Sequence, residues 1–284
     1  MNNSSKSILL SLTAVVMWAS LASFGINLVH IPPFFTLAVA FLIGSIPCWL
    51  NPKAMFPDLK TFVVGSLGYF GYHFFLFMAF RFAPAIEANL INYMWPILLV
   101  MISPIFFKDA KLKWYHFLGA FLALIGCYVL VMGKGAELDF NYIKGYLLAS
   151  GAAILWPLYT IFKMKSRPTS IHAIGGFCFG SSILCFATHL MIERSVGLQG
   201  TDFLNLIIMG LGPVGLAFYA WDMASKLGDT RVMGAISYLT PVLSTLGLIL
   251  FAGQTMDKST TIAMVLILCG ASAGILDLRS KSSH

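Results

Sequence analysis

The chain has 284 residues, of which 58% are hydrophobic and only 10% are charged. A soluble domain carries about 25% charged residues, so this composition excludes a water-facing surface over most of the molecule, and the expected solvent is a lipid bilayer. The formal net charge of +7 could suggest nucleic acid, but the basic residues lie scattered between apolar stretches and form no basic stripe, which argues against a nucleic-acid partner.

Apolar stretches recur along the chain, each long enough to cross a hydrocarbon core of about 30 Å as a helix. Proline, glycine and charged residues separate them, and the connections are too short to hold a separate soluble domain. We therefore predict an all-α integral membrane protein of ten transmembrane helices. The predicted spans are 7–29, 34–50, 61–80, 85–107, 114–132, 145–162, 171–192, 203–224, 232–252 and 260–277.

The first span, 7–29, partly mimics a secretory signal, because it follows Lys6 and reaches the small residues Ala19 and Ala22. Many further spans follow it, and it has an internal counterpart. We therefore expect this span to be retained.

Orientation is predicted from the basic residues, because cytoplasmic loops of membrane proteins hold an excess of Lys and Arg. With the N-terminus inside, thirteen basic residues fall on the cytoplasmic side and five on the opposite side. We predict that both termini are cytoplasmic. The five are Arg81, Lys134, Lys144, Arg194 and Lys258.

An internal repeat relates the two parts of the chain. Asn-Tyr-Met-Trp-Pro at 92–96 is echoed by Ser-Tyr-Leu-Thr-Pro at 237–241, and Trp18 is echoed by Trp156, at offsets of 145 and 138 residues. Five spans per half is an odd number, so the second copy is expected to lie upside down relative to the first. Inverted repeats that rock around a midplane site are typical of transporters. We predict two inverted five-helix repeats, 1–138 and 139–284, with chance coincidence in apolar sequence as the alternative.

The third and fourth spans carry polar side chains that a lipid-facing helix would not tolerate. Tyr72 and His73 share one face of the third span, and His73 is ionisable and near the middle of that span. Asn92, Tyr93 and Pro96 share one stripe of the fourth. Such groups usually face a cavity or a partner, so we predict that these residues line a central cavity; an aromatic stripe that serves only packing is the alternative.

Pro96 and Pro241 occupy matching places in the two halves. A proline inside a helix frees the carbonyl four residues earlier, which here belongs to Asn92 or Ser237. In lipid this carbonyl must be satisfied by protein, water or substrate. We predict a helix kink at each proline, with the freed carbonyl at the cavity; a kink that only assists packing is the alternative.

Two acidic residues allow a structural and a functional interpretation. Glu87 is expected near the outer end of the fourth span. In the structural interpretation it pairs with Arg81 or reaches water, and in the functional one it is a site for an ammonium group or a proton, a role for which His73 is the other candidate. Asp222 precedes Lys226 by four residues, a spacing that favours a helical ion pair near the cytoplasmic rim.

Searches for catalytic motifs find none. The sequence contains no G-x-x-x-x-G-K-[ST], HExxH or GxSxG motif and no Cys/His pattern with metal-ligand spacing. We therefore predict no enzyme activity, no metal, no cofactor and no direct use of ATP. A membrane-embedded enzyme acting on lipid-linked substrates would need clustered acidic or histidine residues at one membrane face, which the sequence does not offer.

Three segments carry a family resemblance. The segments 86–96 (IEANLINYMWP), 217–221 (AFYAW) and 237–244 (SYLTPVLS) resemble the drug/metabolite transporter superfamily, in its ten-helix EamA-type branch, and are most similar to the bacterial aromatic amino acid exporters. Asp222 departs from the asparagine expected in those exporters, which puts substrate identity near that rim in doubt.

The resemblance implies a basket of ten helices around a central cavity in which aromatic side chains hold the substrate. The expected function is export of aromatic or other neutral amino acids, or similar small amphipathic metabolites, by alternating access, and the location that the resemblance implies is a bacterial inner membrane. The alternative is transport of another metabolite or a cationic drug. The expected partners are the bilayer and a small-molecule substrate, with no obligate protein partner. The implied cavity residues are Tyr72, His73, Tyr93, Trp95 and Trp156, with Trp18, Trp221 and Tyr238 placed less securely.

Overall fold

The computed structural model describes residues 2–21, 24, 27–107, 112–132, 139–165, 170–252 and 256–275. Over these ranges the regular structure is helical and contains no strand, which confirms the all-α fold. Five helical segments are long and apolar enough to cross a membrane, and three shorter apolar helices accompany them in the described part of the chain. The total of ten crossings stays a prediction.

In the first half of the chain, the elements are α1 (Asn3–Ala19), α3 (Pro33–Ser45), the short η1 (Ile46–Cys48), α4 (Pro52–Met55), α5 (Leu59–Phe82), α6 (Ala85–Asn92), α7 (Trp95–Phe106) and α8 (Trp114–Met132). In the second half, they are η2 (Phe140–Tyr142), α9 (Ile143–Lys165), α10 (Ala173–Ile192), α11 (Gly200–Leu211), the π-helical η3 (Gly212–Leu216), α12 (Ala217–Leu227), α13 (Thr230–Ser237), α14 (Leu239–Ala252) and α15 (Lys258–Ile275).

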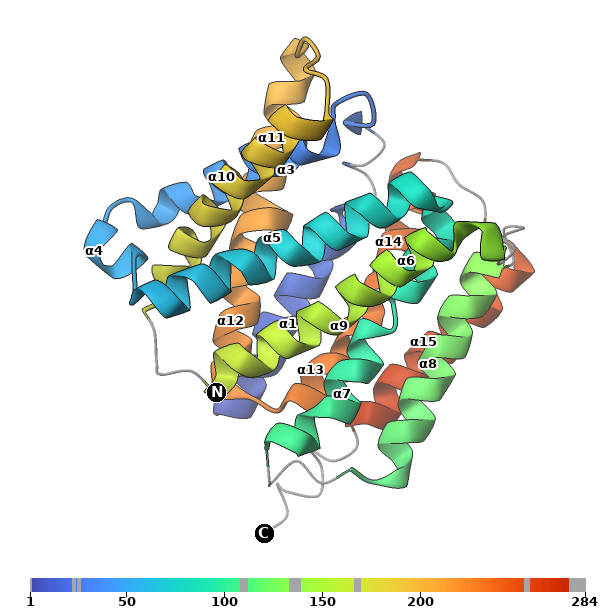
Figure 1. The fold of residues 1–284 in the computed structure, drawn as a ribbon. Helices are drawn as coiled ribbons and strands as arrows, with labels where there is room; N and C mark the ends of the chain where they lie inside the picture. Colours follow the sequence, from blue (N-terminus) through green and yellow to red (C-terminus); the bar gives the residue numbers. More distant parts are fainter. Residues whose placement is uncertain are drawn as a thin grey trace.

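The two halves interdigitate. The most extensive helix contacts pair α8 with α15, α5 with α9, α3 with α10, and α1 with α12, and each pair joins one helix from each half. Figure 1 shows α5 and α9 crossing the middle of the bundle and α8 and α15 side by side along one edge. A site between these pairs is therefore built from both halves.

Glycines allow the close approach of the paired helices, as small residues do in membrane bundles. A methyl group added at Gly68 on α5 would lie 2.2 Å from the Tyr159 ring on α9, and one at Gly176 on α10 would lie 2.1 Å from the Met55 carbonyl oxygen. A methyl group at Gly270 on α15 would lie 2.4 Å from the carbonyl oxygen of Gly119 on α8. Larger residues at these positions would force the helices apart.

Both copies of the repeated motif interrupt a helix. The fourth predicted span divides into α6 and α7 at Tyr93 and Met94, just before Pro96, and the ninth divides into α13 and α14 at Tyr238, just before Pro241. The eighth span contains a third irregularity, because the π-helical η3 with Pro213 separates α11 from α12. Such backbone at membrane depth has to lie within the protein or face a cavity.

Candidate functional site: a cavity between the two halves

A cavity of about 500 Å³ lies between helices of both halves. Its wall includes Leu28, Val29 and Ile31, which lie between α1 and α3, and Val29 is 80% exposed, so the cavity reaches the surface at this end of the bundle. We call this end the mouth. Within the described part of the chain, the wall contains no Lys, Arg, Asp or Glu. Its aromatic and polar residues are Trp18, Phe24, Thr36, Tyr72, His73, Phe77, Phe80, Asn89, Asn92, Tyr93, Trp95, Trp156, Phe218, Ser237, Thr240 and Ser244.

The structure brings together most of the residues named from the sequence. Those that line the cavity are Trp18, Tyr72, His73, Asn92, Tyr93, Trp95 and Trp156, which come from α1, α5, the α6–α7 break, α7 and α9. Trp221, Tyr238, Glu87, Pro96 and Pro241 are not part of its wall. Sequence reasoning named the freed carbonyl of Ser237 but assigned no role to Phe77, Phe218 or Thr240, which also line the cavity.

Four tryptophans close the inner end of the cavity, and we call them the tryptophan cluster: Trp18, Trp95, Trp156 and Trp221. The Trp18 ring centroid lies 6.4 Å from Trp95, 5.8 Å from Trp156 and 5.2 Å from Trp221. Trp95 and Trp221 are themselves 5.8 Å apart and nearly perpendicular. Edge-to-face contacts of this kind stabilise a defined ring arrangement. Trp221 therefore supports the cavity floor from behind without lining the cavity.

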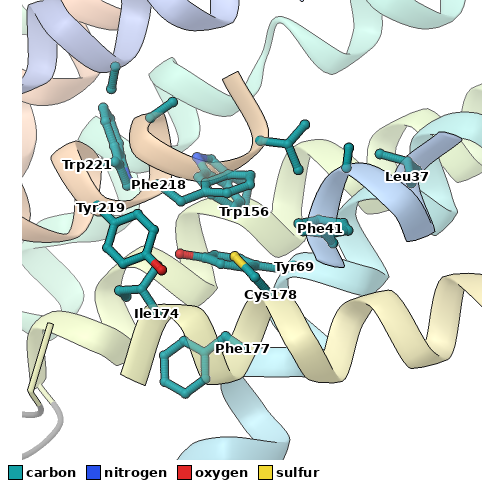
Figure 2. Packing of buried hydrophobic residues seen from close by; sticks show 14 of the residues in the cluster. Leu37, Phe41, Tyr69, Trp156, Ile174, Phe177, Cys178, Phe218, Tyr219 and Trp221 are labelled. Atoms are coloured by element: carbon teal, nitrogen blue, oxygen red, sulfur yellow. The ribbon is translucent and has the colours of Figure 1, made fainter. Parts of the chain in front are cut away.

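A second aromatic layer lies against the floor. Figure 2 shows Tyr69, Trp156 and Phe218 close together. The Tyr69 and Phe218 rings are stacked at 4.3 Å, and Trp156 lies 6.0 Å from Tyr69 and 5.6 Å from Phe218. Tyr69 is 1% exposed. These contacts join α5, α9 and α12 into one aromatic plug, in which Trp156 and Phe218 line the cavity and Tyr69 is buried against them.

Among the polar side chains of the cavity wall, two have their orientation fixed by described hydrogen bonds. Asn92 Nδ2 donates a hydrogen bond to the Tyr72 hydroxyl at 3.2 Å, while Asn92 Oδ1 is buried and has no hydrogen-bond partner among the described residues. His73 Nδ1 donates to the Tyr69 carbonyl at 2.7 Å, which leaves Nε2 of the neutral ring as an acceptor. The site therefore offers hydrogen-bond acceptors to a ligand, although its own wall carries no fixed charge.

Tyr238 was expected at the cavity but lies outside its wall. It is 2% exposed and packs in a separate cluster with Cys127, Val242 and Ile267. Its neighbour Ser237 lines the cavity instead. The side chain direction at the α13–α14 break was not readable from the motif, because one residue of rotation moves a side chain to another face of a helix.

Glu87 is buried at 6% exposure, and Oε2 finds no hydrogen-bond partner within the described ranges. It sits in the first turn of α6, whose cavity face carries Asn89 and Asn92 instead. One alternative, an ion pair with Arg81, does not form within the described residues, and Arg81 donates to the Ile192 carbonyl at 3.3 Å. A direct contact of Glu87 with a ligand in the cavity is therefore absent from this arrangement.

Charged residues gather beyond the aromatic plug. The predicted ion pair is confirmed, because Lys226 Nζ lies 2.5 Å from Asp222 Oδ2. Lys163 on α9 also contacts this carboxylate, at 3.6 Å from Oδ1, and sequence reasoning missed it. Only the packing of α9 against α12 places Lys163 there.

A helical bundle with paired halves, broken helices and a central uncharged cavity is the architecture of a membrane transporter. The chain belongs to the EamA-like transporter family, whose model matches residues 5–132 and again residues 143–273. This confirms the family resemblance of the sequence motifs and the presence of two repeats. The protein is therefore a multi-pass inner-membrane transporter.

Two named relatives and one solved structure are similar to this chain over most of their length. The aromatic amino acid exporter YddG of Ancylobacter novellus is 34% identical over 281 residues, covering 96% of this chain and 98% of that protein. The exporter of the same name from Escherichia coli is 27% identical, covering 84% of this chain and 86% of that protein. A solved crystal structure that is 34% identical in sequence matches with a TM-score of 0.92, covering 99% of this chain and 100% of that one.

Proposed function

We propose that this transporter exports aromatic or other neutral amino acids, or similar small amphipathic metabolites, by alternating access. The observation that carries the proposal is the cavity between the two halves, whose wall combines Trp and Tyr rings with uncharged polar groups. The names of the relatives, which describe export of aromatic amino acids, support the same substrate class.

The size and chemistry of the cavity suit such a substrate. Its volume of about 500 Å³ falls within the range of roughly 300–1,000 Å³ that small-molecule sites occupy. Rings such as Trp95 and Trp156 offer apolar surface to a side chain, and Asn92 Oδ1 and His73 Nε2 offer acceptors to an ammonium group. A polyanionic cargo such as a nucleotide would favour Lys or Arg in the wall, and the described wall has neither.

The proposed orientation places both termini in the cytoplasm, on the strength of the basic residues in alternate loops. The mouth lies at the far end of α1 from the N-terminus, so the structure then represents a state open to the outside. The tryptophan cluster closes the route to the cytoplasm in this state. Energy comes from a gradient or from the substrate's own concentration difference, and His73 and Glu87 are the candidate proton carriers.

Counterflow in proteoliposomes tests the proposal. The purified chain is loaded with an unlabelled amino acid, and uptake of labelled aromatic amino acids, other neutral amino acids, nucleosides and a cationic drug is compared. We expect a clear preference for amino acids and a strong loss of flux in Tyr93→Ala, His73→Ala and Trp156→Ala. A preference for nucleosides or cationic drugs would overturn the substrate class, and unchanged flux in all three variants would overturn the site.

A further inference from the structure

A second pocket, of about 430 Å³, lies beside the mouth. We call it the vestibule. It is lined by residues 29–33, by Arg81 near the end of α5 and by residues 192–194 at the end of α10. Three residues of the first range also line the cavity between the halves, so the two spaces adjoin. A substrate that moves between the cavity and the outside through the mouth therefore passes the vestibule.

The vestibule differs from the cavity in charge. The described cavity wall has no charged residue, whereas the vestibule has Arg81, Glu193 and Arg194. Both arginines are exposed, and they are two of the five basic residues that the proposed orientation places outside. Neither guanidinium contacts a carboxylate among the described residues. His30, also in the wall, is directed elsewhere, with Nε2 at 3.1 Å from Asp202 Oδ2.

Glu193 does not neutralise the two arginines, because its carboxylate has other partners. It accepts hydrogen bonds from the backbone N–H of Phe34 at 3.2 Å and of Phe35 at 3.3 Å, at the start of α3. Its Oε2 also lies 3.0 Å from His189 Nδ1, and its side chain is only 2% exposed. The Glu193 carboxylate therefore joins α10 to α3 and leaves the vestibule with an excess of positive charge.

The guanidinium of Arg81 is held in the vestibule. Its Nη2 donates to the Ile192 carbonyl at 3.3 Å, and Arg194 follows Ile192 by two residues. This bond uses one of the five N–H groups of the guanidinium, so the others stay available to a ligand. Arginine binds a carboxylate through two parallel hydrogen bonds, a geometry that a lysine cannot offer. The vestibule therefore suits an anionic, planar group.

An amino acid in the cavity has a carboxylate for which the described wall supplies no cation. We infer that the vestibule is a second binding site, at which Arg81 and Arg194 bind the carboxylate of an amino acid at the mouth. The inference rests on the proposed function, because it takes an amino acid as the substrate. The aromatic cavity selects the side chain, and the vestibule adds a preference for a carboxylate as the substrate passes.

Competition binding tests this inference. The full chain in nanodiscs, where both membrane faces are accessible, binds labelled phenylalanine, and unlabelled phenylalanine or phenylalaninamide competes. The amide keeps the ring and the ammonium and lacks the carboxylate. In the wild type we expect phenylalanine to compete about tenfold better than the amide. The double variant Arg81→Gln with Arg194→Gln should lose most of this preference, because phenylalanine binds more weakly while the amide binds at least as well as before.

Control variants separate the vestibule from outer charge in general. Lys144→Gln with Lys258→Gln removes two exposed basic residues of the same outer set that do not line the vestibule, and it should keep the wild-type preference. Where the double arginine variant is unstable, Arg194→Gln alone gives the same test, because it removes no described hydrogen bond. Exposed charges are screened by salt, so raising the ionic strength from about 0.05 M to about 0.5 M should weaken phenylalanine binding in the wild type and not in the double arginine variant.

The outcomes are distinct. If the double arginine variant keeps the wild-type preference, or weakens both ligands by the same factor, the inference is wrong. If its binding differs from that of the wild type only in nanodiscs that contain phosphatidylglycerol, and not in phosphatidylcholine alone, the arginines bind a lipid phosphate and the inference is also wrong. Phenylalanine counterflow by the wild type would still support the proposed function in both cases. Absence of any amino-acid counterflow by the wild type would instead overturn the proposed function, and this inference with it.

Discussion

Trp18 on α1 and Trp156 on α9 meet edge to face at the cavity floor, with ring centroids 5.8 Å apart and planes 80° apart. The two residues occupy matching positions in the two halves of the sequence, 138 residues apart. Residues related by a pseudo-twofold axis meet one another only near that axis. Their contact therefore marks the place where the two halves join and where a substrate would pass between them.

Trp156→Ala should reduce transport more than tenfold and destabilise the protein. The Trp156 ring is 3% exposed and packs against Trp18, Tyr69 and Phe218, so its removal leaves a cavity in the plug. Loss of a buried aromatic side chain costs about 3–5 kcal/mol in soluble cores. Thermal unfolding in detergent and counterflow in proteoliposomes measure the two effects.

Two further variants make this result specific. Trp156→Phe keeps an aromatic ring and should restore part of the stability and part of the flux. Trp114→Ala removes a tryptophan that is 73% exposed, and its effect on stability should stay within about 0.5 kcal/mol. Equal losses in Trp114→Ala and Trp156→Ala would show that the position of Trp156 at the floor has no special role.

Asn92→Ala should weaken apparent substrate affinity about tenfold with a smaller effect on stability. The change removes the donor to the Tyr72 hydroxyl and the buried acceptor Oδ1 that faces the cavity region. A tenfold loss corresponds to about 1.4 kcal/mol, which is the scale of one hydrogen bond in a buried site. The concentration dependence of counterflow measures it. Asn141→Ala, at an exposed position outside the cavity wall, is the matched control, and an equal loss there would contradict the assignment.

The sequence was sufficient to predict the helical segments, because lipid requires long apolar helices with internally satisfied backbones. Polar groups that lipid would not tolerate predicted Tyr72, His73, Asn92 and Tyr93 at the cavity, whereas Trp18, Trp95 and Trp156 were expected there only from the family resemblance. The prediction failed for Tyr238, although Tyr93 at the matching position lines the cavity. A cavity open at one end gives equivalent residues of the two repeats different surroundings. Lys163 could not be found either, because its contact with Asp222 depends on the rotation of α9 against α12.

Cysteine labelling tests the proposed orientation. Val29 is 80% exposed at the mouth, and Leu50 is 94% exposed beyond the other end of α3. In a Cys269→Ala background, which removes the exposed native thiol, Val29→Cys should react with a membrane-impermeant maleimide on intact cells. Leu50→Cys should react only after permeabilisation. The reverse pattern would place the mouth on the cytoplasmic side and the N-terminus outside, which would contradict the proposed orientation.

Gly176→Ala should destabilise the bundle by about 1–3 kcal/mol, which is the usual cost of overpacking. The added methyl group would lie 2.1 Å from the Met55 carbonyl oxygen, and backbone atoms cannot rotate away as a flexible side chain can. Gly247→Ala on α14 is the matched control, because nothing lies within 4 Å of its added methyl group. Replacing a helical glycine with alanine stabilises the helix by about 1 kcal/mol. The midpoint temperature of thermal unfolding in detergent should therefore fall for Gly176→Ala and rise for Gly247→Ala.

Flux shows whether this contact also takes part in transport. Because α10 packs along α3 and α5, a loss of stability in Gly176→Ala with unchanged flux at low temperature would show that the contact only supports the fold. If both variants were equally stable, the close approach of α10 to α4 would not be a feature of the folded protein.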